Sequence, residues 1–76
     1  MYLYIPKREH LYSAEAGSYI SYGINVFHEK DQYSTPIASI SDVSIDFDSV
    51  SNLCKLCTKM QLEPIHLWDV AEDFIA

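Results

Sequence analysis

The hydrophobic period of this chain changes near residue 45, and this change constrains the fold more than any other feature of the sequence. Before that point apolar and polar residues alternate, as they do in strands, and all six tyrosines lie before residue 34. After it, apolar residues recur every three or four positions, as they do in amphipathic helices. The sequence therefore predicts an α+β fold, with a small antiparallel sheet of about three strands in residues 1–45 and a two-helix hairpin in residues 46–76 that packs on one face of the sheet.

The length of the chain limits the number of domains. Its 76 residues predict one domain over residues 1–76, because a second would need at least about 50 residues of its own. Apolar residues make up 49% of the chain and charged residues 21%, which is typical of a globular protein and not of a disordered one. So small a core leaves little rigid frame for a catalytic cleft.

The strands are predicted from the alternation and from the residues that interrupt it. A first strand in residues 1–5 should stop at Pro6, because proline cannot donate a hydrogen bond to a neighbouring strand. The strongest strand covers residues 18–28, where Gly23 marks a bulge or the close approach of another element. A third strand is expected over residues 35–41. In the second strand one set of alternate residues should face the core: Ile20, Tyr22, Ile24 and Val26.

Cap chemistry places the first helix at residues 47–60. With Asp46 as the N-cap, Ile45 and Val50 occupy the two positions of a hydrophobic staple, whereas an N-cap at Asp48 would place a polar residue there. The apolar stripe of this helix has helical spacing and consists of Val50, Leu53, Cys54, Cys57 and Met60.

The second helix is predicted to begin at Pro64, where the missing N–H of proline has no cost. Only two or three residues separate it from the first helix, so the two should form a tight hairpin. Its apolar stripe is Leu67, Val70, Ala71 and Phe74, widened by Trp68 and Ile75. Its opposite, solvated face carries Asp69, Glu72 and Asp73.

Charge and targeting features bear on partners and compartment. The net charge is −6, and binding to nucleic acid needs clustered Lys and Arg, so we expect no nucleic-acid partner. No stretch approaches the ~18–20 apolar residues of a membrane span, and the basic pair Lys7-Arg8 follows the first apolar run instead of preceding it as in a signal peptide. Two cysteines without an export signal favour a reducing compartment, and we expect a cytoplasmic protein that binds no membrane.

Cys54-Lys55-Leu56-Cys57 is a Cys-x-x-Cys motif, which can supply half of a zinc site or a redox dithiol. A zinc site needs further ligands, and the candidates are His66, His10 and His28. Both cysteines lie in the middle of a predicted helix on its apolar face, where neutral thiols pack as small apolar groups. We therefore expect core packing with no metal and no cofactor, and keep Cys54, Cys57 and His66 as metal candidates.

A second constellation lies on the second helix. His66, Asp69 and Asp73 share one helical face and could hold a metal ion or act as acid and base, but the same pattern fits a solvated face. Two glycines are too few for a phosphate-binding loop, and no nucleophile–histidine–acid order is present. We expect that the protein is not an enzyme.

The carboxyl-terminal half resembles a known family. The residues that carry the resemblance are Tyr22-Gly23-Ile24 and the block of residues 62–75, which reads LEPIHLWDVAEDFI. They are similar to a family of short, uncharacterised bacterial proteins of the Firmicutes type, which ends in Leu-Ser-Pro-x-His-Leu-x-Asp-Val-x-Glu-Asp-Phe. The resemblance covers roughly residues 18–76, and this chain departs from it by having Glu63, a poorer N-cap, where the family has Ser. The resemblance implies no activity and no functional residue.

The tyrosines of the front half are the one functional signal that remains: Tyr2, Tyr4, Tyr12, Tyr19, Tyr22 and Tyr33. Tyrosine is enriched at interfaces, but its ring also suits the exposed face of a small sheet. Tyr19 and Phe27 should lie on the face opposite the core, so we expect a protein–protein interaction module, either for an unknown partner or as a homodimer with these two residues near its centre. The alternative is a metal- or thiol-dependent regulatory domain that uses the Cys-x-x-Cys.

Overall fold

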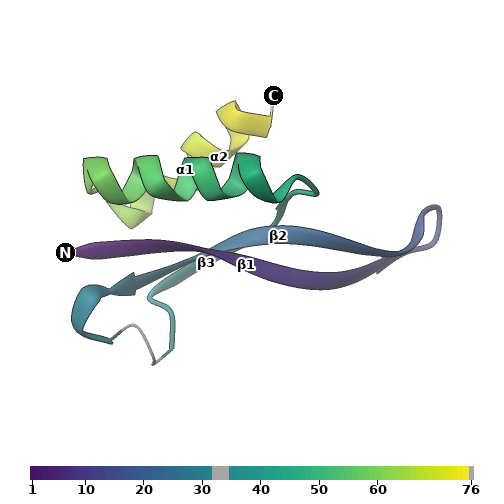
Figure 1. Ribbon diagram of the computed structural model, residues 1–76, viewed down its shortest axis with the longest axis horizontal. Helices are drawn as coiled ribbons and strands as arrows, with labels where there is room; N and C mark the ends of the chain where they lie inside the picture. Colours follow the sequence, from purple (N-terminus) through teal and green to yellow (C-terminus); the bar gives the residue numbers. More distant parts are fainter. Residues whose placement is uncertain (32–34, 76) are drawn as a thin grey trace.

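The alternating front half forms an open antiparallel sheet in the computed structural model, which describes residues 1–31 and 35–75 (Figure 1). Its strands are β1 (Tyr2–Ser13), β2 (Gly17–His28) and β3 (Ala38–Ser44), in the order β1-β2-β3 with β2 in the centre. A tight turn joins β1 to β2, and Gly17 there has a φ of 73°, a conformation that glycine adopts without strain.

The helical back half covers one face of this sheet, as predicted for an α+β fold (Figure 1). Helix α1 (Phe47–Met60) packs mainly on β1 and β2, while α2 (Leu67–Ile75), which follows the short 3₁₀ helix η2 (Pro64–His66), contacts β3. Another 3₁₀ helix, η1 (Glu29–Asp31), follows β2. Of the helices in the described ranges, none has both the length and the apolarity needed to cross a bilayer.

The bounds of α1 are those predicted, although the Asp46 side chain makes no capping hydrogen bond to the backbone of the first turn. Asp46 occupies the N-cap position, and its side chain accepts a hydrogen bond from the Ser49 hydroxyl at 2.5 Å. At the other end Gln61 has a φ of 50°, and its N–H and that of Leu62 bond to carbonyl oxygens of the last turn. The left-handed residue ends the helix and turns the chain toward η2.

The core lies between the sheet and the two helices, and most of the predicted inward residues are in it. It consists of Tyr4, Ile24, Val26, Ile40, Val43, Val50, Leu53, Cys54, Cys57, Leu67 and Ala71. Tyr22 is only half-buried and packs at the core edge, with its ring 5.2 Å from that of Phe47. Ile20 is half-buried and lies opposite His10, toward the hairpin turn.

The prediction that Pro6 ends the first strand is wrong, because β1 continues to Ser13. The N–H groups of Tyr2 and Tyr4 point away from β2, since both donate to side chains of the α1 region. By the two-residue repeat, Pro6 also directs its nitrogen to the outer side, where no bond of the sheet is lost. Since β1 is an edge strand, it tolerates the proline.

The third strand also differs from its prediction over residues 35–41: it begins at Ala38 and extends to Ser44. The pairing of β2 with β3 shifts between Tyr22 and Ile24, and Asp42 has a φ of 54°. Three residues of β3 thus lie opposite one residue of β2, which is a bulge. The bulge lets the strand continue past the point where its alternation fails.

Several residues predicted in the apolar stripes are exposed. Met60 is 69% exposed, Trp68 66% and Phe74 40%, and Ile45 is 73% exposed, so it does not form a hydrophobic staple with the buried Val50. Among the described side chains of the short helix α2, those of Leu67 and Ala71, one turn apart, are the buried ones, and Trp68 is rotated about 100° from Leu67. The side chain of Ile75 and the whole of Tyr33 lie outside the described residues.

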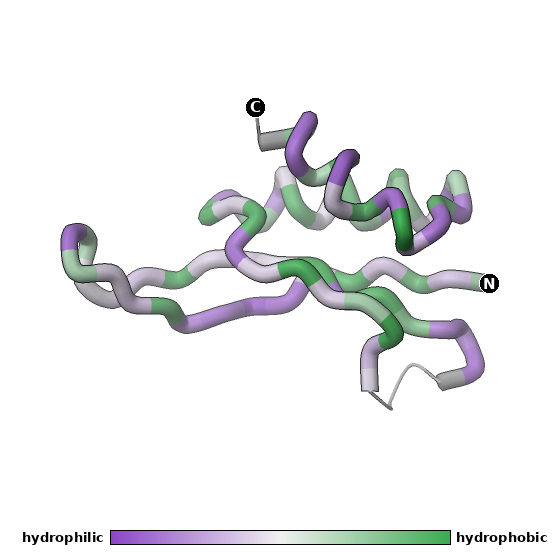
Figure 2. Tube along the Cα trace, turned by 180° about the vertical axis from the view of Figure 1, so that it is seen from behind, coloured by the Kyte–Doolittle hydropathy of each residue, from purple (hydrophilic) through white to green (hydrophobic). Residues whose placement is uncertain are grey.

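The hairpin of β1 and β2 extends well beyond the helices and makes the molecule long, with extents of 39 × 27 × 20 Å (Figure 1). We call the extending part, residues 8–21, the ribbon. In Figure 2 a hydrophilic stretch of β1, residues 7–10, lies where the ribbon joins the half of the hairpin that the helices cover.

Candidate functional site

The sheet face opposite the helices is open, and both predicted interaction residues lie on it. Tyr4 and Val26 point into the core, so the alternate residues of β1 and β2 point to the other side. Tyr19 and Phe27 belong to this second set and are half-buried. They are eight positions apart on one strand, about 26 Å, so an interface that used both would extend along most of the sheet.

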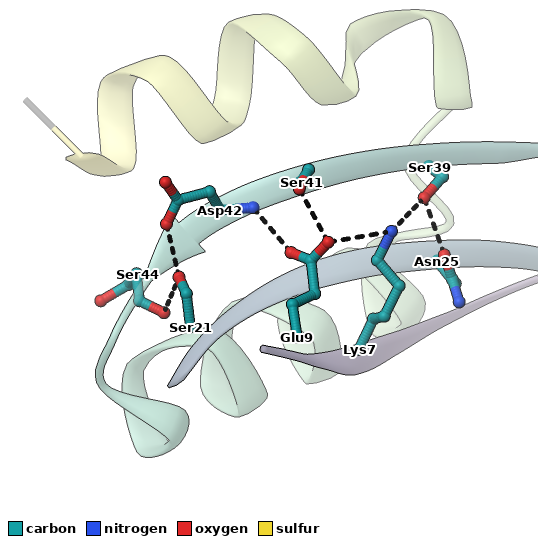
Figure 3. Close-up of polar contacts among 8 residues, drawn as sticks. All are labelled: Lys7, Glu9, Ser21, Asn25, Ser39, Ser41, Asp42 and Ser44. Carbon is teal, nitrogen blue, oxygen red and sulfur yellow. Dashed lines mark hydrogen bonds and ion pairs between the residues drawn. The ribbon is translucent and has the colours of Figure 1, made fainter. Parts of the chain in front are cut away.

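The middle of the open face is a polar bridge that joins all three strands (Figure 3). Glu9 of β1 extends across β2 to β3, where its Oε1 accepts the Asp42 N–H at 2.8 Å and its Oε2 accepts the Ser41 hydroxyl at 2.7 Å. The Nζ atom of Lys7 lies 3.5 Å from Glu9 Oε2 and donates a hydrogen bond to Ser39 Oγ at 3.0 Å. Ser39 in turn donates to Asn25 Oδ1 at 2.8 Å.

Gly23 makes this crossing sterically feasible. A Cβ at this position would lie 2.9 Å from Glu9 Oε1 and would collide with the Ile40 carbonyl oxygen. The sequence prediction of a bulge or a close approach at Gly23 is thus confirmed in both senses, because the register shift also occurs here. Glu9 itself was missed, since only the register of β1 against β2, with Lys7 opposite Gly23, brings it there.

Asp42 is the second acceptor of the bridge. Its Oδ1 accepts the Ser21 hydroxyl at 2.5 Å, and its Oδ2 accepts the Tyr19 hydroxyl at 3.1 Å. Ser21 is fully buried, and its Oγ also lies 3.2 Å from the Ser44 carbonyl oxygen. The hydrogen bond to Asp42 raises the pKa of Tyr19, because the neutral phenol is the donor.

The carboxylate of Glu9 is stabilised in its charged form. Burial acts to raise the pKa of Glu9, but the hydrogen bonds from residues 41 and 42 and the Lys7 ammonium outweigh it, so the pKa lies below its ordinary value. Within the described residues every buried side-chain polar atom has a hydrogen-bond partner. The bridge therefore holds the bulge of β3 in place.

The two cysteines lie on the buried face of α1, where sequence reasoning placed them, at 2% and 3% exposure. Burial is the main cause that raises the pKa of Cys54 to about 12, and the neighbouring Cys57 adds to it. Burial also raises the pKa of Cys57. His66 is exposed on η2. Residues 1–31 and 35–75 contain no group of three or more His, Cys, Asp or Glu side chains that could hold a metal ion. This applies both to His66 with the two thiols and to His66 with Asp69 and Asp73.

The end of the open face near the amino terminus is apolar. Leu3 pairs with Phe27, Ile5 is the next residue of β1 on the same side, and all three are half-buried. Beside it Met1, His28, Glu29 and Lys30 line a depression of about 300 Å³. The face thus combines an apolar end, a rigid polar centre and Tyr19 at its far end.

Comparison with known proteins identifies a family but no activity. Residues 2–76 match the model of a family of unknown function, DUF6514, and the chain belongs to this family. No curated protein and no solved structure is significantly similar to it. The prediction that the chain belongs to an uncharacterised family is therefore confirmed.

Proposed function

We propose that this member of the DUF6514 family is a small protein–protein interaction module whose binding surface is the open face of the sheet. The observation that supports this proposal is the one-sided covering of the sheet: both helices lie on one face, and Leu3, Ile5 and Phe27 remain half-buried on the other. Protein interfaces combine apolar contact area with polar groups, and this face offers both, with its apolar patch at one end and the polar bridge beside it.

The polar bridge favours binding because it makes the face rigid before a partner arrives. Lys7, Glu9 and Asp42 are already held by hydrogen bonds, so little side-chain entropy would be lost on association. The acidic net charge of −6 favours a protein over a nucleic acid as the partner. The free, buried thiols are compatible with the cytoplasm, where we place the protein.

A second copy of the chain is the partner that we propose first, since two-fold dimers are the commonest oligomers. Phe27 would lie at the apolar end of the contact and Tyr19 at its far end. The carboxyl-terminal block that resembles the bacterial family would then have a structural role, because it supplies Leu67 and Ala71 over β3.

Sedimentation equilibrium at micromolar concentration tests this function with two matched variants. Phe27→Asp places a charge in the apolar end of the face, and Trp68→Asp makes the same kind of change on α2, where the residue is 66% exposed. We expect wild type and Trp68→Asp to exceed 8.7 kDa and Phe27→Asp to shift toward it.

A clean 8.7 kDa species for the wild type would contradict self-association and leave a different protein as the partner. In that case, photo-cross-linking in cells that express the protein tests whether the open face binds another protein. The photoreactive residue is placed at position 27, and a second variant with this residue at position 68 is the control. A cross-linked adduct at position 27 alone supports the module, and the absence of an adduct at both positions contradicts it.

A further inference from the structure

The outer edge of β1 is covered at its beginning by the end of α1. The Tyr2 N–H donates to Gln61 Oε1 at 2.8 Å, and the Tyr4 N–H donates to Thr58 Oγ1 at 3.0 Å. Gln61 Nε2 returns a hydrogen bond to the Tyr2 carbonyl oxygen at 3.1 Å. Pro6, the next residue of the same orientation, has no N–H. This part of the edge therefore offers no donor to another strand.

The remainder of the same edge is free. By the two-residue repeat Arg8, His10 and Tyr12 direct their N–H groups outward, and within the described part of the chain none of these groups donates a hydrogen bond. Their side chains are exposed, Tyr12 at 75%, because the helices do not extend over the ribbon. The free edge begins after Pro6 and ends at the turn that follows Ser13. Unpaired edges of this kind readily add a further strand.

We propose that this free edge pairs in antiparallel fashion with the same edge of a second copy of the chain, about a two-fold axis at His10. The proposal rests on the interaction function above for the partner, a second copy, and differs from it in the contact: the strand edge joins the two copies in place of the Phe27 end of the open face. In this register His10 faces its own equivalent, Arg8 faces Tyr12 of the second copy, and Lys7 faces Ser13 of the second copy.

The bounds of the free edge select this register. Residues 7–13 are centred on His10, so every outward N–H and C=O of both copies finds a partner, which gives about six hydrogen bonds. An axis at Arg8 would place Pro6 opposite His10 of the second copy and lose a donor on each side. An axis at Tyr12 would place Arg8 opposite the hairpin turn. The register centred on His10 is therefore the one in which the paired strands avoid both Pro6 and the hairpin turn.

The charges agree with the same register. Arg8 lies opposite an aromatic ring, a favourable pair, and no two like charges lie directly opposite. The helices lie over the other end of each sheet, away from the axis, and they carry the acidic residues Asp48, Asp69, Glu72 and Asp73. The axis is perpendicular to the sheet, so the open faces of both copies would lie on one side and form a surface twice as large.

Disulfide cross-linking tests the register directly. His10→Cys should form a dimer on mild oxidation, because residues opposite each other in a strand pair have Cα atoms about 5.5 Å apart, which suits a disulfide. Tyr12→Cys should not, since its own equivalent would lie four positions away, about 13 Å. The native thiols are buried and give no background. Cross-linking of Tyr12→Cys as fast as His10→Cys, or of neither, would overturn the proposal.

His10→Pro provides a second test that keeps the monomer intact, because Pro6 shows that a proline at this orientation costs no bond within the sheet. We expect it to weaken dimerisation roughly tenfold or more by sedimentation, with His10→Ala, which keeps the N–H, close to wild type. If Phe27→Asp abolishes the dimer and His10→Pro does not, the edge contact is wrong and the face contact stands. If His10→Pro abolishes it alone, the edge is the contact between copies.

Discussion

The two halves of the β1–β2 hairpin share one alternating pattern but have different surroundings. In the covered half Tyr4, Ile24 and Val26 are buried under α1, and the outer edge of β1 is bonded to the helix end. In the ribbon Arg8, His10 and Tyr12 hold the equivalent positions, are exposed and leave the edge free. The alternation thus specifies which side a residue takes, whereas the length of α1 decides whether that side is buried.

The largest expected difference is between the core that covers the first half and the ribbon, and it is the cost of removing a leucine. Leu53→Ala on α1 should lower the free energy of unfolding by about 2–5 kcal/mol, because it leaves a cavity in the core at a residue that is 6% exposed. Leu11→Ala in the ribbon should cost less than about 1 kcal/mol, since no helix packs there. Urea unfolding of both variants measures this, and equal losses would mean that the ribbon belongs to the same cooperative core.

Gly23→Ala tests the junction of the halves. Its Cβ would meet the Ile40 carbonyl oxygen and Glu9 Oε1, so we expect a loss of about 1–3 kcal/mol in thermal or urea unfolding. Gly23→Ala combined with Glu9→Ala provides the control. The pair should lose less than the sum of the single variants, and strict additivity would show that Glu9 does not cross Gly23.

Gln61→Ala tests the edge cover of the first half. It removes hydrogen bonds to both the N–H and the carbonyl oxygen of Tyr2, so we expect a loss of about 1–2 kcal/mol and faster amide exchange at Tyr2. Exchange at His10 in the ribbon should not change when the protein is monomeric. Equal acceleration at both positions would indicate global destabilisation instead of an opened edge.

The smallest effect is expected from pH. The folded-state pKa of Glu9 is lowered from the ordinary value of 4.5, so the carboxylate contributes stability above that value and the contribution is lost as the pH falls through the folded pKa. Wild type should therefore lose more stability than Glu9→Gln when acidified from neutral pH. Glu15→Gln, in the exposed hairpin turn, should follow wild type. Parallel curves for wild type and Glu9→Gln would refute a role for this charge.

The hydrophobic periodicity of the sequence predicted much of this fold. The predictions that were wrong share one cause. The helix at residues 47–60 and the inward side of Ile24 and Val26 follow from local spacing, which the chain carries in any context. The continuation of β1 through Pro6 depends on its being an edge strand, and the strand order is not a local property. The exposure of Trp68 and Met60 likewise depends on where each helix lies on the sheet.

The candidate site was predictable only in part for the same reason. Alternation placed Tyr19 and Phe27 on one face, and Gly23 indicated that something approaches there. That Glu9 is the residue that approaches follows from the register of β1 on β2, which required the strand to pass Pro6. The role of Asp42, which accepts hydrogen bonds from Tyr19 and Ser21, could not be predicted, because it depends on the bulge in which Asp42 has a left-handed conformation.

The crossing of Gly23 by Glu9 has a consequence for the history of this family. A side chain at position 23 would approach a long carboxylate at position 9 and collide with the Ile40 carbonyl oxygen, although positions 9 and 23 are fourteen apart in the chain. Relatives that replace the glycine are therefore expected to differ both at the position of Glu9 and in the path of the third strand at Ile40, and those that keep the carboxylate to keep the glycine. The two positions should change together across the lineage, and sequences that break this pairing would have to bind their third strand by other means.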